Sequence, residues 1–143
     1  MASVSRSALV PYSAEQMYQL VNDIDCYPEF VPWCVNSTSE LLSEKQKQAT
    51  LYFARGAIKT HFTTRNDLYS GERIDMKLVD GPFKHLHGDW KFIDIEDHGS
   101  RVQLELEFEL SNRMLKVALE AFFNQICDRL VSSFVERANE VYL

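Results

Sequence analysis

The amino-acid sequence predicts an α+β fold in which a curved antiparallel sheet wraps around one long C-terminal helix. The first indication is a period of two among the apolar residues between about residue 33 and residue 110, which is typical of strands. The second is a period of 3.6 over residues 112–142, which is typical of a helix. A twisted sheet that curls around one helix does not close its interior as two flat layers do. We therefore expect a cavity between the sheet and this helix.

The N-terminal region predicts one strand followed by two short helices. Residues 3–10 form the strand, which ends at Pro11. Ser13 and Gln16 have the spacing of a capping box, in which each side chain bonds the backbone N–H of the other residue. The apolar positions that follow share one face of a helix and are Met17, Leu20, Val21 and Ile24. A second short helix is expected over residues 25–30.

Six further strands are expected before the long helix, and turn residues separate them. Their ranges are 34–42, 47–55, 58–69, 73–79, 86–95 and 101–110. In the last of them apolar residues alternate strictly with polar or charged ones. This alternation predicts a sheet with one buried face and one exposed face.

A single long helix is predicted at the C-terminal end of the sequence. Ser111 or Asn112 is expected to cap its N-terminus. Its apolar stripe consists of Leu115, Leu119, Phe122, Phe123, Ile126, Leu130, Phe134 and Ala138. About thirty residues at ~1.5 Å per residue give a length of about 45 Å, so the helix must lie across the sheet.

Length and composition predict one globular domain over residues 1–143. Hydrophobic side chains make up 45% and charged side chains 25%, as in ordinary soluble proteins. The 15 Lys and Arg against 21 Asp and Glu give a net charge of −6, which argues against DNA and against a broad RNA-binding face. The three cysteines lack disulfide-framework spacing, and neither a signal peptide nor a membrane span is apparent, so we expect reduced thiols and a cytoplasmic location.

The sequence contains no motif that predicts catalysis or metal binding. It has neither a nucleophile elbow nor a glycine-rich phosphate loop. His85, His87 and Asp89 alternate along a predicted strand and share one face, as metal ligands on a strand would. Alternating polar residues are equally typical of the exposed face of a half-buried strand, and we favour that interpretation. We therefore predict no catalytic residue and no metal ligand.

Two polar residues on an otherwise apolar strand face are candidates for ligand recognition. Phe62, Thr64, Asn66 and Leu68 share a parity, and if they face inward two hydrogen-bonding groups lie in an apolar space. Such groups can orient the carbonyl or hydroxyl of a ligand. The alternative is that Thr64 and Asn66 bond to each other or to water within the core.

Aromatic side chains make up 12% of the chain, which is enough to line a pocket as well as to fill a core. The predicted ligand-binding residues are Trp33, Phe62, Thr64, Asn66, Phe83, Leu86, Trp90, Phe92, Leu106, Phe108, Leu119, Phe122, Phe123 and Ile126. Phe83 follows the turn residues Gly81 and Pro82. We expect it to be either a mouth or lid residue of the pocket or a buried anchor in an ordinary turn.

Several segments taken together resemble the coenzyme Q-binding START-like family, within the SRPBCC or polyketide cyclase superfamily. They are Ser7–Cys34, Thr63–Asn66, Leu78–Phe83, Gly88–Phe92 and Arg137–Tyr142. The resemblance extends over essentially the whole chain and implies a helix-grip fold of the START/Bet v 1-like type with a hydrophobic cavity. It implies a bound ubiquinone or other lipid, transient membrane contact, no required cofactor and no agreed catalytic residue.

The resemblance implies two alternative roles. The first is a non-enzymatic carrier of ubiquinone or a related polyisoprenoid lipid that supports respiration. The second follows from a still closer similarity to the bacterial ribosome association toxins, which bind the large ribosomal subunit and block its association with the small one. Contact with ribosomal RNA would need a local basic patch, for which the candidates are Lys77, Lys84, Lys91 and Arg101.

A cyclase or aromatase is a lesser alternative on the same fold. It would need an acid or a base inside the cavity. His61 and His87 are the imidazoles near strand centres, and both have the parity that we assign to the outer face. The sequence therefore favours a binding protein over an enzyme.

Overall fold

The computed structural model describes residues 2–111 and 116–142. Within these residues, seven strands form one antiparallel sheet in the order β1-β7-β6-β5-β4-β3-β2. In chain order the elements are β1 (Ala2–Val10), α1 (Ala14–Asn22), the 3-10 helix η1 (Ile24–Glu29), β2 (Cys34–Ser43), β3 (Gln46–Arg55), β4 (Ile58–Tyr69), β5 (Arg73–Asp80), β6 (Phe83–Asp94), β7 (Ser100–Leu110) and α2 (Lys116–Val141). This is the predicted order of elements.

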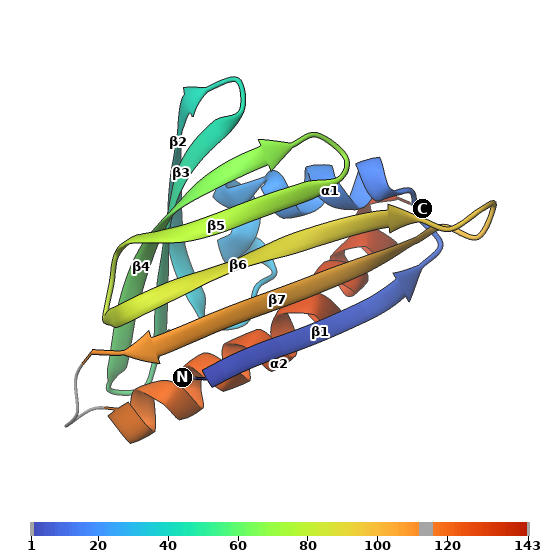
Figure 1. The fold of residues 1–143 in the computed structure, drawn as a ribbon. Coiled ribbons are helices and arrows are strands. Elements are labelled where there is room, and N and C mark those ends of the chain that lie inside the picture. The colour runs from blue at the N-terminus through green and yellow to red at the C-terminus, as the bar shows by residue number, and fades with distance from the viewer. Residues whose placement is uncertain (1, 112–115, 143) are drawn as a thin grey trace.

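The sheet forms one curved layer, and α1 and α2 lie together on one side of it (Figure 1). The β2–β3 hairpin stands at a steep angle to β6 and β7, as expected for a strongly twisted sheet (Figure 1). Helix α2 runs along β1 and β7 and also touches α1. The arrangement is a helix-grip α+β fold, which confirms the predicted fold class.

The N-terminal helices form where the sequence places them. The Ser13 hydroxyl accepts a hydrogen bond of 3.1 Å from the backbone N–H of Gln16, and the Gln16 side chain accepts one of 2.9 Å from the N–H of Ser13. This is the predicted capping box. At the other end of α1, the Lys47 ammonium group donates a 2.9 Å hydrogen bond to the carbonyl of Asn22. The cation thus satisfies a carbonyl left open at the end of a helix.

Strand β6 departs from the prediction at its start. It begins at Phe83, three residues earlier than the predicted residue 86. The pairing with β7 is irregular between Phe83 and His85, which is the position of a β-bulge. Because a bulge interrupts the alternation, Phe83 and Leu86 are both buried although their parities differ. The other strand ends agree with the prediction to within one residue.

Helix α2 packs through the predicted stripe. It has 26 described residues, which corresponds to about 39 Å at ~1.5 Å per residue. Phe122, Ile126 and Phe134 are among its buried residues. An ion pair between Arg6 of β1 and Asp128 ties the helix to the edge strand. The proposed cap Asn112 and the stripe residue Leu115 lie outside the described residues.

No helix in the described part of the chain is both long enough and apolar enough to cross a membrane.

Candidate functional site, an apolar cavity beneath the long helix

An apolar cavity lies between the sheet and the helices, where the topology predicts one. Its wall is formed by strands β3 to β7, by α1 and η1, and by the middle of α2. The free volume of the cavity is about 70 Å³. Aliphatic and aromatic side chains make up most of the wall, so the cavity is a place for apolar groups.

Eight of the fourteen predicted ligand-binding residues lie on this wall. They are Phe62, Thr64, Asn66, Leu86, Trp90, Leu106, Phe123 and Ile126. Alternation along the strands and the 3.6 period of α2 account for all of them. Their contact with a ligand stays a prediction.

Three of the remaining residues lie at a second and smaller void. Phe83, Leu119 and Phe122 line a space of about 10 Å³ beside the main cavity. Phe83 is only 7% exposed, and the centre of its ring lies 5.2 Å from that of Phe123 and 6.0 Å from that of Phe62. The structure therefore corrects the expectation of a mouth or lid at Phe83. This residue is a buried anchor, because the bulge in β6 directs it into the core.

Phe92 and Phe108 fill the core and do not line the cavity. The ring of Phe92 lies edge-on to Tyr18 of α1, with 5.8 Å between the ring centres. The ring of Phe108 lies 4.7 Å from that of Phe123 and 6.1 Å from that of Phe83. Inward-facing parity does not distinguish a residue that packs from one that faces free space, and the structure places these two outside the wall. Their contact with a ligand stays a prediction.

Trp33 lies apart from the cavity, half-buried between η1 and β2. Its backbone is left-handed, with φ of 64°. Its ring lies 5.6 Å from the ring of Phe122, and the guanidinium carbons of Arg55 and Arg129 lie 5.3 Å and 5.7 Å from its centre. Trp33 is therefore not a wall residue but the centre of a surface cluster with two cations, which we call the Trp33 corner (Trp33, Arg55 and Arg129).

Several wall residues were not predicted. They are Val21, Ile24, Tyr27, Ala49, Leu51, Phe53, Ile74, Met76, Leu104, Cys127 and Leu130. Most belong to elements whose inward parity is visible in the sequence, as for Ile74 and Leu104. The contributions of β3 follow only from its register with β4, which places Ala49 opposite Thr64 and Leu51 opposite Phe62.

Thr64 and Asn66 form the polar part of the wall. Both are buried, at 7% and 3% exposure. The Thr64 hydroxyl donates a 2.7 Å hydrogen bond to the Asn66 side-chain oxygen, so the alternative in which the two bond to each other is confirmed. This bond uses the amide oxygen and leaves the Asn66 amide nitrogen as a donor. Among the described residues this nitrogen donates no hydrogen bond, so it is a polar donor available to the cavity.

The ionisable groups on the wall are both held in their neutral form. Burial raises the pKa of the Tyr27 phenol, whose hydroxyl donates to the carbonyl of Val21. Burial also raises the pKa of the Cys127 thiol from 9.0 to about 12. No histidine, carboxylate, lysine or arginine lies on the described wall. The described cavity therefore offers no charged acid or base at neutral pH.

The imidazoles considered for catalysis lie on the other side of the sheet. His61 lies 3.5 Å from the carboxylate of Asp80, and its side chain is 50% exposed. His87 lies 3.5 Å from the carboxylate of Glu107, also with a side chain 50% exposed. Both face away from the cavity, as the parity predicted.

The candidate basic residues do not gather into one patch of positive charge. Lys77, Lys84 and Arg101 are exposed and Lys91 is half-buried, on strands β5, β6 and β7. The carboxylates of Glu105, Glu107 and Glu109 occupy the same outer face of β7. Lys91 itself lies 4.0 Å from the carboxylate of Asp89. The outer face is therefore of mixed charge.

The fold and the site together define a helix-grip protein with an apolar cavity between its sheet and its long helix. Residues 10–135 match the family described as polyketide cyclase/dehydrase and lipid transport, and the chain belongs to this family.

Known proteins with similar sequences include a ribosome association toxin and a coenzyme Q-binding protein. The ribosome association toxin RatA of Escherichia coli K12 is 44% identical over 142 residues, which cover 99% of this chain and 90% of the relative. The mitochondrial coenzyme Q-binding protein COQ10 of Dictyostelium discoideum is 27% identical over 136 residues, which cover 92% of this chain and 66% of the relative.

A solved structure with the same fold is the Zhui aromatase/cyclase from Streptomyces sp. R1128. It has a TM-score of 0.87 over 99% of this chain and 96% of that protein, at 14% sequence identity. At this identity the likeness shows the fold and nothing about the reaction.

Proposed function

We propose that the protein is a non-enzymatic carrier of a hydrophobic ligand, and that the ligand is ubiquinone or a related polyisoprenoid quinone. The observation that supports this most directly is the apolar cavity with a single polar corner at Thr64 and Asn66. The family description, which includes lipid transport, and the name of the COQ10 relative support the same class of ligand. As a carrier in the cytoplasm with transient membrane contact, it would support respiration by moving a quinone.

The chemistry of a quinone head group matches the polar corner. A quinone ring offers carbonyl and ether oxygens, which only accept hydrogen bonds. The Asn66 amide nitrogen is a donor, and Thr64 holds the amide in the orientation that directs this nitrogen away from the Thr64 hydroxyl. Burial of the isoprenoid groups would supply most of the affinity, at about 0.8 kcal/mol per methylene removed from water.

The size of the cavity sets a condition on this function. Its free volume of about 70 Å³ is well below the roughly 300–1,000 Å³ of typical ligand pockets. A quinone ring therefore enters only if wall side chains move apart, and the isoprenoid tail must extend out of the cavity. Four of the wall residues belong to α2, namely Phe123, Ile126, Cys127 and Leu130, so a small outward shift of this helix would enlarge the space.

The binding function needs neither a cofactor nor a catalytic group. The ionisable groups on the described wall, Tyr27 and Cys127, are neutral at neutral pH because burial raises their pKa values. This favours a carrier over a cyclase or aromatase, which would need an acid or a base within reach of the ligand.

Quinone binding can be measured by quenching of Trp90, because quinones quench indole fluorescence at short range. The chain has two tryptophans, so Trp90 is the only tryptophan in the Trp33→Phe variant and selective excitation of indole reports on it alone. We expect saturable quenching by a short-chain ubiquinone, and Asn66→Leu should weaken binding about five- to tenfold through the lost hydrogen bond. Asn36→Leu, at an exposed position on β2, is the matched control and should leave binding unchanged.

Two outcomes would contradict the proposed ligand. One is the absence of quenching at saturating quinone in the Trp33→Phe protein. The other is an organic extract of the protein, purified from its native host, that contains neither a quinone nor another lipid in near-stoichiometric amount. Recovery of a different lipid would support the carrier function but would show that the ligand is not a quinone.

We infer a second candidate function from the relatives named ribosome association toxin, of which the Escherichia coli K12 protein is 44% identical to this chain. In this role the protein would bind the large ribosomal subunit and block assembly of the ribosome. The net charge of −6 disfavours a broad RNA-binding face, so contact must be local. The Trp33 corner fits such a contact, because an aromatic ring flanked by two guanidinium groups can stack on an exposed base and bind its phosphate.

Sucrose-gradient profiles of cells that overproduce the protein test this second function. We expect fewer assembled ribosomes and more free subunits, and we expect the effect to be lost in the Arg55→Glu, Arg129→Glu double variant. Lys45→Glu is the matched control, because this exposed cation lies between β2 and β3, outside the Trp33 corner and outside the candidate basic patch. An unchanged profile with the wild-type protein would contradict the ribosomal role without bearing on quinone binding.

A further inference from the structure

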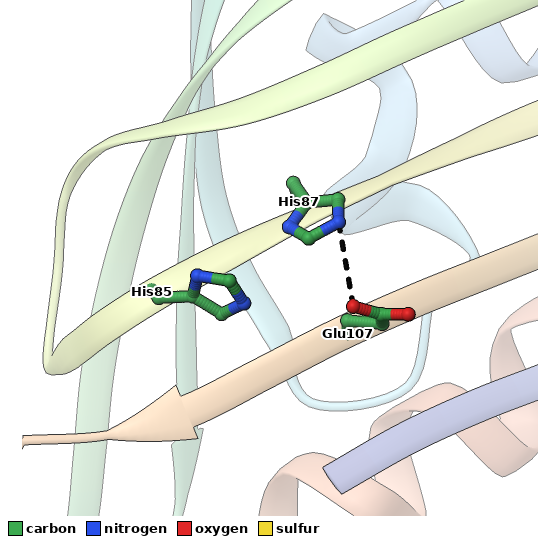
Figure 2. Close-up of side chains that lie close together, drawn as sticks. All are labelled: His85, His87 and Glu107. Atoms are coloured by element: carbon green, nitrogen blue, oxygen red, sulfur yellow. Dashed lines mark ion pairs between the residues drawn. The ribbon is translucent and has the colours of Figure 1, made fainter. Parts of the chain in front are cut away.

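Two histidines and one glutamate come together on the outer face of the sheet, away from the cavity. His85 and His87 are two residues apart on β6 and therefore point to the same side. Glu107 of β7 lies directly opposite His87 in the antiparallel register. Figure 2 shows the three side chains on one side of the two strands, with His87 and Glu107 directed at each other.

The spacing of the three side chains is close to that of metal ligands. One ligand atom from each lies within 4.8 Å of the other two, and in the part of the chain that the structure describes this is the one cluster of its kind. The His87 Nε2 atom lies 3.5 Å from the Glu107 carboxylate oxygen. Two ligands of a tetrahedral zinc ion with bonds of about 2.0–2.1 Å lie about 3.4 Å apart. This pair is thus already at the separation that an ion between them would impose.

His85 supplies a second and independent observation. Its Nε2 atom is shielded from solvent and has no hydrogen-bond partner among the described residues. A shielded polar atom without a partner is costly and calls for an explanation. The His85 and His87 rings are perpendicular, with an interplanar angle of 88° and 4.9 Å between their centres, so they do not stack face to face. A metal ion next to the rings would give His85 the partner that it lacks.

The surrounding charge favours a cation at this position. On β7, Glu109 lies opposite His85 and Glu105 lies opposite Asp89, on either side of Glu107. On the other neighbouring strand, β5, Lys77 lies opposite His87, and its positive charge would repel a cation. The carboxylates outnumber this cation, so the local field attracts a positive ion more than it repels one.

We propose that His85, His87 and Glu107 bind a divalent transition-metal ion, of the class of Zn²⁺, in a three-ligand site. Two imidazoles and one carboxylate are a donor set that zinc accepts, with the fourth tetrahedral position left to water or to a group from outside. A surface hollow of about 420 Å³ lies beside His87 and Glu107 and is lined by Ser3 and Ser5 of β1, so the open position is accessible. The site is independent of the quinone cavity, because it uses the opposite face of the sheet.

Titration calorimetry with ZnCl₂ on untagged, chelator-treated protein tests the site. We expect one Zn²⁺ per chain. Loss of a second-shell partner already lowers metal affinity about 10–100-fold, so His85→Ala, His87→Ala and Glu107→Gln should each weaken binding at least about tenfold. His61→Ala is the matched control, because His61 also faces a carboxylate on the outer face, at 3.5 Å from Asp80, but belongs to no such cluster.

A second readout separates the site from loose surface binding. Co²⁺ in a tetrahedral site absorbs visible light strongly, whereas octahedral Co²⁺ absorbs weakly, so the wild-type protein should show an intense band that Zn²⁺ removes. Thermal unfolding of each variant in the absence of metal checks that the fold is retained. The proposal is overturned if the wild-type protein binds no Zn²⁺, or if His61→Ala weakens binding as much as the cluster variants do.

Discussion

Strand β6 presents apolar side chains to one face of the sheet and ionisable ones to the other. On the inner face, Leu86 and Trp90 are 6% and 3% exposed and line the cavity. On the outer face, His85 and His87 alternate with them and meet Glu107 of the neighbouring strand. Both faces use the same backbone hydrogen bonds, so the difference lies wholly in which side of the pleat a residue occupies.

The two proposed sites therefore depend on different physical effects. The inner site depends on burial, where any lost volume costs stability as well as binding. The outer site depends on the geometry of three exposed or half-buried side chains, whose replacement changes the stability little. A substitution at one position of β6 should therefore affect one site and spare the other.

The largest effect is expected where the inner face meets α2. Phe134 is fully buried, and its ring centre lies 5.2 Å from that of Tyr27 and 5.3 Å from that of Trp90. Phe134→Ala should lower the free energy of unfolding by about 3–5 kcal/mol, measured by urea denaturation with circular dichroism. The outer-face control Tyr52→Ala, at a residue that is 36% exposed, should cost less than about 1 kcal/mol. If both variants lost the same free energy of unfolding, burial on the inner face would not be the main source of stability.

Much of the inner face could be predicted from alternation alone. The parity of Phe62, Thr64 and Asn66 shows in the sequence because a strand has a period of two. Whether Thr64 and Asn66 bond to each other depends on side-chain conformations that no pattern encodes, and the structure answers this with the 2.7 Å hydrogen bond. The sequence thus identified the polar corner but left its internal bond open.

Other features depend on contacts between segments that are distant in sequence. Phe83 is buried because of a bulge in its pairing with β7, and a local pattern does not reveal a bulge. The sequence placed Asp89 of the same strand beside the two histidines, in a set for which we favoured an ordinary exposed strand face, whereas the structure brings Glu107 to them through the register of β6 and β7. Register of this kind is set by the whole sheet, and so the outer cluster was missed.

A substitution at Gly88 should break the independence of the two faces. A Cβ atom at this position would overlap the carbonyl oxygen of Glu105 and lie 2.6 Å from a methyl group of Leu106. Gly88→Ala must therefore push β6 and β7 apart, at a cost of about 1–3 kcal/mol in the free energy of unfolding. Because Glu107 and Leu106 move with β7, Zn²⁺ and quinone binding should both weaken.

The exposed residue Lys84 on the same strand provides the control for Gly88. Lys84→Ala should change neither the stability nor either binding reaction, because its side chain points into solvent. If Gly88→Ala weakened only one of the two binding reactions, the backbone of β6 would not couple the two faces. The two sites would then be independent even when the strand itself is displaced.

The smallest effect concerns the pH dependence of stability, to which the inner face contributes through Cys127. Burial raises the pKa of this thiol from 9.0 to about 12, and its side chain is 1% exposed. Above pH 9 the unfolded chain loses the thiol proton while the folded chain keeps it, so the folded state binds more protons and its stability falls as pH rises toward 12. The contribution of this one thiol is a loss of about 1 kcal/mol by pH 10.

Urea denaturation at pH 8 and pH 10 measures this slope. In Cys127→Ala the loss between the two pH values should be smaller than in the wild-type protein by about 1 kcal/mol, whatever the change in stability at pH 8. Ser133→Ala is the matched control, since Ser133 is a small buried residue of α2, 7% exposed, without a titratable group, and it should retain the wild-type slope. A Cys127→Ala slope equal to that of the wild type would mean that water reaches the thiol in the folded protein. The cavity wall would then be wetter than its apolar composition implies, which would weaken the case for a quinone site on the inner face more than for a metal site on the outer one.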